Sequence, residues 1–249
     1  MQGIRECNKY FLEERDNTVC KGISYHDFKH IDFSQLKQYE QRFLTKYGDT
    51  DTTRRRLYSL YYGSLTNFRP SQAISMYTIA NTKTILDPCA GWGSRCFGAM
   101  SYGANYIGFD TNIHLEQPYK KLIEEYNLHN KDISIYFEDS STADFSRFTY
   151  DTVLTSPPYY KRELYRHMPA YTSPSDFHCR FLKPMLSNAY LHLQPGGHFF
   201  INLPSSFYSN IVDALSRDCD AKYEYRKTKR NNTTYTEYIY CWIKPMDSD

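Results

Sequence analysis

No apolar stretch in the 249 residues approaches the roughly 20 residues that a membrane span requires. The amino-terminal segment MQGIRECNKYFLEERD carries too many charges for a signal peptide. The formal net charge is only +2, which is too small to indicate a nucleic-acid-binding protein by itself. We therefore expect a soluble, intracellular protein with no membrane partner, and any basic surface must come from local clustering of charges.

Cysteines at metal-binding spacings are also missing. The seven cysteines form no CxxC pair and no zinc-finger spacing, so we expect reduced and mostly buried thiols. His26 and His30 lie one helical turn apart, but two histidines without a third ligand nearby are typical of a surface helix. We expect no metal site.

The first 66 residues predict a helical extension ahead of the main domain. Apolar residues recur at three- and four-residue steps between Phe33 and Tyr47, within a stretch from Ile31 to Thr78 that favours helix. Asp51 and the two threonines after it are typical of a helix start. Residues 1–70 hold 12 Lys/Arg against 9 Asp/Glu. A solvated helical surface explains this small excess at least as well as a binding face.

From Thr84 onward, short apolar segments alternate with longer periodic ones, which is typical of parallel strands joined by helical crossovers. Two alternating runs near the carboxyl end flank Asn231-Asn232 and predict an antiparallel hairpin. We therefore predict that residues 67–249 form an α/β domain with a mostly parallel sheet and an antiparallel C-terminal hairpin. The predicted parallel strands are TILDP, NYIGFD, ISIYFED, DTVLTS and HFFINL, and the predicted helices are SRCFGAMSYG, HLEQPYKKLIEEYNLH, residues 175–193 and FYSNIVDALSRD.

Two glycines follow the first of these strands, in TILDPCAGWGSR. Ligands in open parallel sheets bind beyond the carboxyl ends of the strands, and glycines there let the backbone approach a ligand closely. The third glycine of the dinucleotide fingerprint is missing because Arg95 and Cys96 follow Ser94, which disfavours a nicotinamide enzyme. No Lys-Ser/Thr pair follows either, so a phosphate cradle fits poorly. The loop predicts another kind of cofactor site.

The next two strands also end in acidic residues. Asp110 lies about 20 residues beyond the glycines, where a carboxylate accepts hydrogen bonds from ribose hydroxyls. Glu138 and Asp139 end the third strand and are natural acceptors for an adenine amino group. A lone Asp after a strand is more often a turn or helix cap. Three consecutive strand ends with polar groups instead favour one adenosine-like ligand.

The fourth strand runs into two prolines and two tyrosines, in DTVLTSPPYYKRELY. These residues suit the activation of the exocyclic amine of a nucleobase. Such an amine is a poor nucleophile because its lone pair is delocalised into the ring. Ser156 Oγ and the carbonyl of Pro157 are suited to accept the amine hydrogens, and the prolines hold that carbonyl rigidly. Tyr159 offers an aromatic face to a base that has left its stack. A proline-terminated strand followed by surface tyrosines is the structural alternative.

Together, DPCAGWGSR and TSPPY resemble the cofactor loop and the catalytic motif of the DNA amino-methyltransferases, which methylate adenine N6 or cytosine N4. The resemblance runs in order from Asn67 to Lys244 and includes NFRPSQAISMY, which is similar to the segment that closes over the methionine end of the cofactor. It implies a Rossmann-like methyltransferase fold that binds S-adenosyl-L-methionine and DNA, with RNA as a further possible substrate. The implied catalytic residues are Ser156, Pro157, Pro158 and Tyr159. The implied cofactor-binding residues are Phe68, Arg69, Pro70, Asp87, Cys89, Ala90, Gly91, Gly93, Asp110 and Asp139.

The segment after the catalytic motif carries Lys161, Arg162 and Arg166 among aromatic residues, a pattern that predicts contacts with nucleic-acid phosphates. A mobile lid without base contacts is the alternative. A basic run at 222–230 predicts a positive stripe or a solvated face.

Within the family that the chain resembles, serine at the first position of the catalytic motif, here Ser156, modestly favours cytosine N4 over adenine N6. Many members of that family carry a separate target-recognition region, whereas here only about 20 residues separate the motif from the next predicted helix. Sequence readout must therefore come from residues 1–66, from residues 161–175, from a partner, or hardly at all. An RNA base amino-methyltransferase and an inactive nucleic-acid-binding module with the same fold remain the alternatives.

Overall fold

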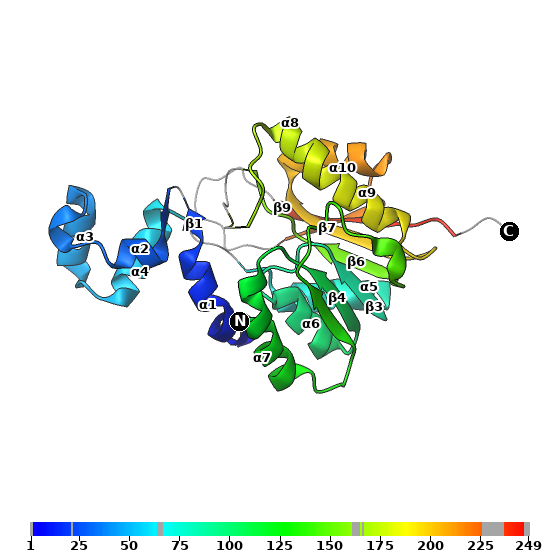
Figure 1. The fold of residues 1–249 in the computed structure, drawn as a ribbon, viewed down its shortest axis with the longest axis horizontal. Coiled ribbons are helices and arrows are strands. Elements are labelled where there is room, and N and C mark those ends of the chain that lie inside the picture. Colours follow the sequence, from blue (N-terminus) through cyan, green and yellow to red (C-terminus); the bar gives the residue numbers. More distant parts are fainter. Residues whose placement is uncertain are drawn as a thin grey trace.

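The computed structural model describes residues 2–20, 22–63, 67–160, 165, 167–225 and 237–246, without the side chains of Gln2 and Cys20. These residues form a seven-stranded sheet with helices on both faces and a helical lobe set apart at one end (Figure 1). Among the described residues, no helix combines the length and the apolar content needed to cross a membrane.

The sheet is parallel over five strands and antiparallel at one edge. Its strand order is β5-β4-β3-β6-β7-β9-β8, with β9 antiparallel to both β7 and β8. The predicted fold class is confirmed, since the five predicted parallel strands and the C-terminal antiparallel pair are present. The predicted turn at Asn231-Asn232 lies outside the described residues. The strands are β3 (Thr84–Asp87), β4 (Asn105–Phe109), β5 (Ile133–Tyr136), β6 (Thr152–Thr155), β7 (His198–Pro204), β8 (Ala221–Glu224) and β9 (Glu237–Ile243).

Helices cover both faces of this sheet because successive strand side chains point to opposite faces. Ile85 packs into a core with α5, α6 and α7, whereas Leu86 packs into a second core with α9 and α10. The predicted helix at 175–193 is broken by a π-helical turn. The helices are α5 (Pro70–Ala80), α6 (Ser94–Tyr102), α7 (Glu116–Tyr126), α8 (Pro174–Phe177), the π turn (His178–Leu182), α9 (Lys183–Leu191) and α10 (Tyr208–Leu215), with 3-10 turns at Phe33–Gln35, Ile113–Leu115, Phe145–Arg147 and Ser205–Phe207.

The helical lobe, residues 22–63, has a small core of its own built from six side chains: Tyr25, Phe28, Leu36, Leu44, Leu57 and Tyr58. The predicted helix start at Asp51 is present, and the Thr50 hydroxyl caps it by accepting the Thr53 N–H at 3.2 Å. The helical stretch predicted from Ile31 to Thr78 is interrupted, since Gly48 ends one helix with a φ of 85°. The lobe consists of β2 (Ile23–Ser24), paired with β1 (Val19–Cys20), and of α2 (Tyr25–Lys29), α3 (Gln38–Tyr47) and α4 (Asp51–Tyr61).

Helix α1 (Gln2–Asn17) packs on the sheet domain although it precedes the lobe in sequence. Phe11 is fully buried, and its ring lies 5.0 Å from that of Tyr119 in α7. A Cβ at Gly93, whose φ is +70°, would lie 2.6 Å from the Phe11 ring. Glycine is therefore required where α1 meets the loop after β3. Of the predicted extension 1–66, the α2–α4 part has its own core and α1 shares the core of the sheet domain.

We predict that Phe11→Ala lowers the free energy of unfolding by about 3–5 kcal/mol, because it leaves a cavity between α1 and α7. Urea denaturation followed by circular dichroism measures this change. Leu12→Ala is the matched control, since the neighbouring Leu12 side chain is 40% exposed. Equal losses in the two variants would show that α1 is not part of the main core.

Candidate functional site

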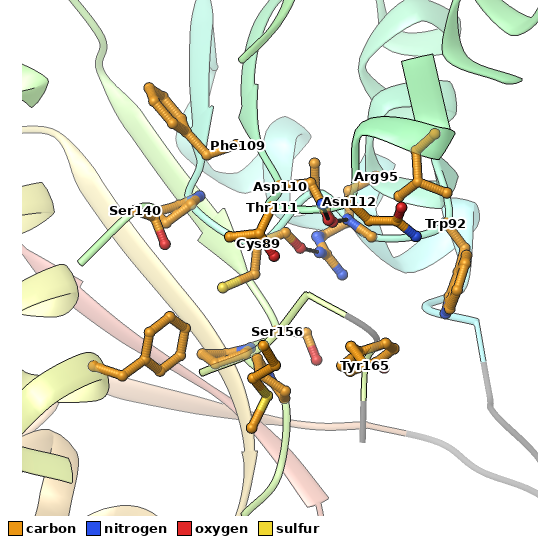
Figure 2. Close-up of a pocket in the computed structure, with 18 of the residues that line it drawn as sticks. Cys89, Trp92, Arg95, Phe109, Asp110, Thr111, Asn112, Ser140, Ser156 and Tyr165 are labelled. Atoms are coloured by element: carbon orange, nitrogen blue, oxygen red, sulfur yellow. Dashed lines mark hydrogen bonds between the residues drawn. The ribbon is translucent and has the colours of Figure 1, made fainter. Parts of the chain in front are cut away.

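A cavity opens at the carboxyl ends of β3, β4, β5 and β6 (Figure 2). The chain moves outward from β3 to β5 and then returns to β6 beside β3, so the strand order reverses here. Ligand sites in open parallel sheets form at such reversals. The cavity encloses about 1190 Å³ of empty space when the open solvent at its mouth is included.

The cavity brings together most of the residues predicted from the sequence. Gly91, Asp110 and Ser156 line it together, and Figure 2 shows Asp110 and Ser156 on opposite sides. The predicted residues that line it are Phe68, Cys89, Ala90, Gly91, Asp110, Asp139, Ser156, Pro157, Pro158 and Tyr159. Arg69, Pro70, Asp87 and Gly93 are not among the lining residues. Lys161, Arg162 and Arg166 lie outside the described residues.

The Asp110 carboxylate ties the loop after β3 to the end of β4. The Gly91 N–H donates to one of its oxygens at 2.9 Å, and the Asn112 N–H donates to the other at 2.9 Å. Gly91 has a φ of +58°, a left-handed conformation that glycine adopts without strain. Burial raises the pKa of Asp110 to about 6, although both N–H groups act in the opposite direction. Its carboxylate therefore titrates near neutral pH.

A buried ion pair lies directly beneath this loop. Asp87 is fully buried and accepts hydrogen bonds from Arg95 Nε and from the Tyr106 hydroxyl, both at 2.6 Å. Arg95 also donates to the carbonyl of Cys89, so one guanidinium links the strand end and the loop. Burial alone would lower the pKa of Arg95, but Asp87 raises it above its ordinary value. Asp87 thus stabilises, through Arg95, the loop that lines the cavity.

Phe68 reaches the cavity from the segment before α5. Its ring lies 5.2 Å from that of Tyr225 and 5.4 Å from the guanidinium carbon of Arg95. The Arg69 N–H donates to the Tyr225 hydroxyl at 3.1 Å. The segment at 67–69 is thereby held against the end of β8 and presents the Phe68 ring to the cavity.

The end of β5 contributes one of its two predicted acceptors. Glu138 forms an ion pair with Arg147 at 3.0 Å and is therefore already engaged. Asp139 uses one oxygen to accept the Ser141 N–H at 2.9 Å, an ordinary turn contact. Its other oxygen receives no hydrogen bond within the described part of the chain, so Asp139 retains acceptor capacity.

A hydrogen-bond chain orients Ser156 at the end of β6. Its hydroxyl donates to Asn202 Oδ1 at 3.3 Å, and Asn202 Nδ2 donates to the carbonyl of Tyr238 at 3.0 Å. Because the hydroxyl hydrogen points to Asn202, the Ser156 lone pairs are left to accept other donors. Asn202 was not predicted as a site residue. The feature of the sequence that could have identified Asn202 is a polar residue within the apolar strand HFFINL, because a buried amide needs a hydrogen-bond partner.

Aromatic residues shape the mouth of the cavity. The Tyr159 hydroxyl donates to Glu237 Oε1 at 3.1 Å, and its ring lies 6.2 Å from that of Phe207. Across the cavity, the Trp92 ring lies 5.9 Å from the Tyr165 ring. Sequence reasoning did not identify Trp92 or Tyr165, because their proximity depends on two distant loops. Within the described residues, no group of three or more His, Cys, Asp or Glu side chains is placed to hold a metal ion.

No protein-family model matches the sequence, and no curated protein matches it. Solved structures do. TrmN from Thermus thermophilus is 16% identical with a TM-score of 0.51, over 70% of this chain and 48% of TrmN, so the match spans about half of that protein. A SAM-dependent methyltransferase from Methanosarcina mazei is 13% identical with a TM-score of 0.50, over 73% of this chain and 100% of that one. The N-methyltransferase NodS from Bradyrhizobium japonicum is 9% identical with a TM-score of 0.50, over 71% of this chain and 94% of NodS. The chain has the Rossmann-like fold of SAM-dependent methyltransferases.

We predict that Asp87→Asn lowers the free energy of unfolding by about 3–5 kcal/mol, because it leaves the buried Arg95 cation without its counter-charge. Urea denaturation at pH 7 measures the change. Asp110→Asn is the matched control, since that carboxylate lines the cavity, accepts two backbone N–H groups and forms no ion pair within the described part of the chain. Wild-type stability of Asp87→Asn would show that the ion pair does not support the site.

Proposed function

We propose that the chain is an S-adenosylmethionine-dependent methyltransferase that acts on the exocyclic amine of a base in DNA, with cytosine N4 favoured over adenine N6. One observation supports it most directly: the loop after β3 and the Ser156-Pro157-Pro158-Tyr159 motif after β6 line one cavity. Direct methyl transfer requires such a cavity, because donor and amine must meet in line at close range.

The residues at the ends of β3, β4 and β5 fit an adenosine moiety. Asp110 would accept hydrogen bonds from the ribose hydroxyls, and Asp139 would accept one from the adenine amino group. The glycine at 91 lets the loop backbone lie close to the ligand, and Phe68 would cover its methionine end. S-adenosylmethionine, when bound, supplies a methyl group activated by a positively charged sulfur.

The opposite wall fits an amine that must be made nucleophilic. Ser156 Oγ and the Pro157 carbonyl would accept the amine hydrogens, so that the nitrogen lone pair turns toward the methyl group. Asn202 holds the serine hydroxyl in the required orientation. With the cofactor held by Asp110 and Asp139, its sulfonium would supply the methyl group to the amine nitrogen, the neutral thioether would be the leaving group, and the surplus amine proton would pass to solvent. No covalent enzyme intermediate is needed.

Tyr159 would hold the base. Its hydroxyl is bonded to Glu237 and its ring lies against Phe207, so the ring is oriented before any base arrives. A base inside a duplex cannot reach a buried methyl group and must leave the stack, and an aromatic face replaces part of the lost stacking. These contacts support Tyr159 as a clamp on an everted base.

The decisive experiment incubates the protein with methyl-labelled S-adenosylmethionine and either DNA or RNA of matched sequence, then digests the product to nucleosides for mass spectrometry. We expect N4-methylcytosine in DNA. N6-methyladenine in DNA would show that the target base is adenine instead of cytosine. Methylation of RNA alone would show that the substrate is RNA instead of DNA. Cofactor binding without any methylated nucleoside would contradict the proposal and indicate an inactive binding module.

We predict that Ser156→Ala lowers turnover by roughly 10²-fold or more while the Kd for S-adenosylmethionine changes little, because only the preorganised acceptor for the amine is lost. Radiolabelled methyl transfer and fluorescence of Trp92, which lines the cavity, measure the two quantities. Ser156→Asn restores an acceptor and should recover part of the turnover. Unchanged turnover in Ser156→Ala would remove this residue from the chemistry.

We predict that affinity for S-adenosylmethionine falls as the pH drops below about 6, because protonation of Asp110 removes an acceptor for the ribose. An Asp with an ordinary pKa of 3.8 would stay charged in this range, and the pKa is raised by burial and by nearby Asp87 despite Arg95. Titrations monitored by Trp92 fluorescence between about pH 5 and about pH 8, a range that spans this pKa of about 6, check the dependence.

Asp110→Asn provides the control for this pH dependence. It should bind the cofactor more weakly, and its affinity should no longer change between the two ends of the same window. The same acid-dependent loss in Asp110→Asn as in the wild type would assign the titration to another group and contradict the role of Asp110.

A further inference from the structure

The exposed Phe, Tyr and Trp side chains of the described residues all lie in the helical lobe. They are Phe33, Tyr39, Tyr47 and Tyr61, and each exposes between 38% and 48% of its surface. The other Phe, Tyr and Trp rings in the described part of the chain are buried or half-buried. The lobe core is formed by other side chains, so it does not account for these exposed rings. A cluster of exposed apolar surface of this kind is a mark of a binding site.

Three of these rings share one face of α3 and α4. The Tyr39 and Tyr61 rings lie 4.6 Å apart, and the Phe43 and Tyr47 rings lie 4.8 Å apart, one helical turn along α3. The Arg56 guanidinium carbon lies 5.9 Å from the Phe43 ring and 5.4 Å from the Tyr47 ring, which joins the two helices. We call this surface the stacking face. It comprises Lys37, Tyr39, Phe43, Lys46, Tyr47, Arg56 and Tyr61.

The cations of the stacking face sit on its aromatic rings. Lys37 Nζ lies 5.9 Å from the centre of the Tyr39 ring, and Lys46 Nζ lies 5.1 Å from that of Tyr47. No ion pair links Lys37, Lys46 or Arg56 to a carboxylate within the described residues. Their charges are therefore available to an anionic partner.

Three carboxylates of the lobe already have partners. Glu40 is buried and accepts from the Lys37 N–H at 2.8 Å and from the Tyr62 hydroxyl at 2.6 Å. Asp49 pairs with Arg54 at 2.5 Å, and Asp51 accepts from the Tyr25 hydroxyl at 2.8 Å. The stacking face is thus both cationic and aromatic, without an acidic side chain among its seven members.

The lobe is linked to the cofactor side of the cavity through α1 (Figure 1). Phe11 of α1 packs against Gly93, and Glu14 of the same helix accepts a hydrogen bond from Asn112 at 3.4 Å. Asn112 lines the cavity. Helix α1 therefore joins the lobe that carries the stacking face to a residue that lines the cavity.

We propose that the stacking face binds an unpaired stretch of the nucleic-acid substrate that flanks the target base. Exposed tyrosine rings stack on bases of any sequence, and the interleaved cations contact the phosphates. An unpaired strand fits better than a duplex, because the base faces of a duplex are already stacked. This inference rests on the proposed function, and it assigns substrate binding outside the cavity to the amino-terminal lobe.

Binding of fluorescein-labelled single-stranded DNA and RNA oligonucleotides of the same sequence, measured by anisotropy without cofactor, tests the proposal. Tyr39→Ala/Tyr61→Ala should raise the Kd at least tenfold, an order-of-magnitude expectation for two lost stacking partners. Lys46→Gln/Arg56→Gln should raise the Kd and reduce the slope of log Kd against log salt by about 1 to 2. Lys121→Gln/Leu128→Ala removes an exposed cation and an exposed apolar side chain elsewhere and should bind as the wild type does.

Several results would overturn the proposal. One is that both stacking-face variants bind the oligonucleotides as tightly as the wild type does. Another is that the wild type binds neither oligonucleotide. A third is that analytical ultracentrifugation shows a wild-type dimer that dissociates in Tyr39→Ala/Tyr61→Ala. Circular dichroism and urea denaturation check that each variant is folded. Because the assay needs no methyl transfer, binding through this face without catalysis would contradict only the proposed function. Methylation with unaltered oligonucleotide binding in both variants would contradict only this inference.

Discussion

The buried ion pair between Asp87 and Arg95 is the interaction on which the cofactor side of the cavity depends. Burying a carboxylate or a guanidinium alone costs desolvation free energy. The two are tolerated together because each charge is paired with the other. Arg95 contacts the Cys89 carbonyl and lies near the Phe68 ring, so the pair joins the strand end, the loop and the segment before α5. The loop conformation follows from this internal charge pair before any ligand is present.

A second constraint acts on the other wall of the cavity. The parallel pairing of β6 with β7 places Thr155 opposite Ile201, so the next residues along, Ser156 and Asn202, come within hydrogen-bond distance. Two prolines then stop the strand and fix the backbone direction. The rigidity of this corner comes jointly from sheet register and proline geometry. It suits a site that must hold an amine in one orientation.

The tyrosines of this chain have different roles in the sheet domain and in the helical lobe. In the sheet domain, Tyr77, Tyr106 and Tyr119 are buried beside the cavity. Their hydroxyls donate to the backbone carbonyl of Arg95, the carboxylate of Asp87 and the backbone carbonyl of Gly91, respectively. In the lobe, Tyr39, Tyr47 and Tyr61 expose their rings. The same residue type thus supplies buried hydrogen bonds in one place and open stacking surface in the other. Helix α1 connects the two.

The sequence by itself determined the parallel strands, the glycine at 91, the acidic ends of β4 and β5 and the Ser156-Pro157 corner. These depend on local periodicity and on backbone chemistry that a short segment carries alone. It did not indicate that Arg95 pairs with Asp87, that Asn202 orients Ser156, or that Phe11 requires glycine at 93. The assembly of the stacking face from α3 and α4 was equally hidden. Only the tertiary structure decided these, because each is a contact between segments whose meeting depends on how the strands and helices pack.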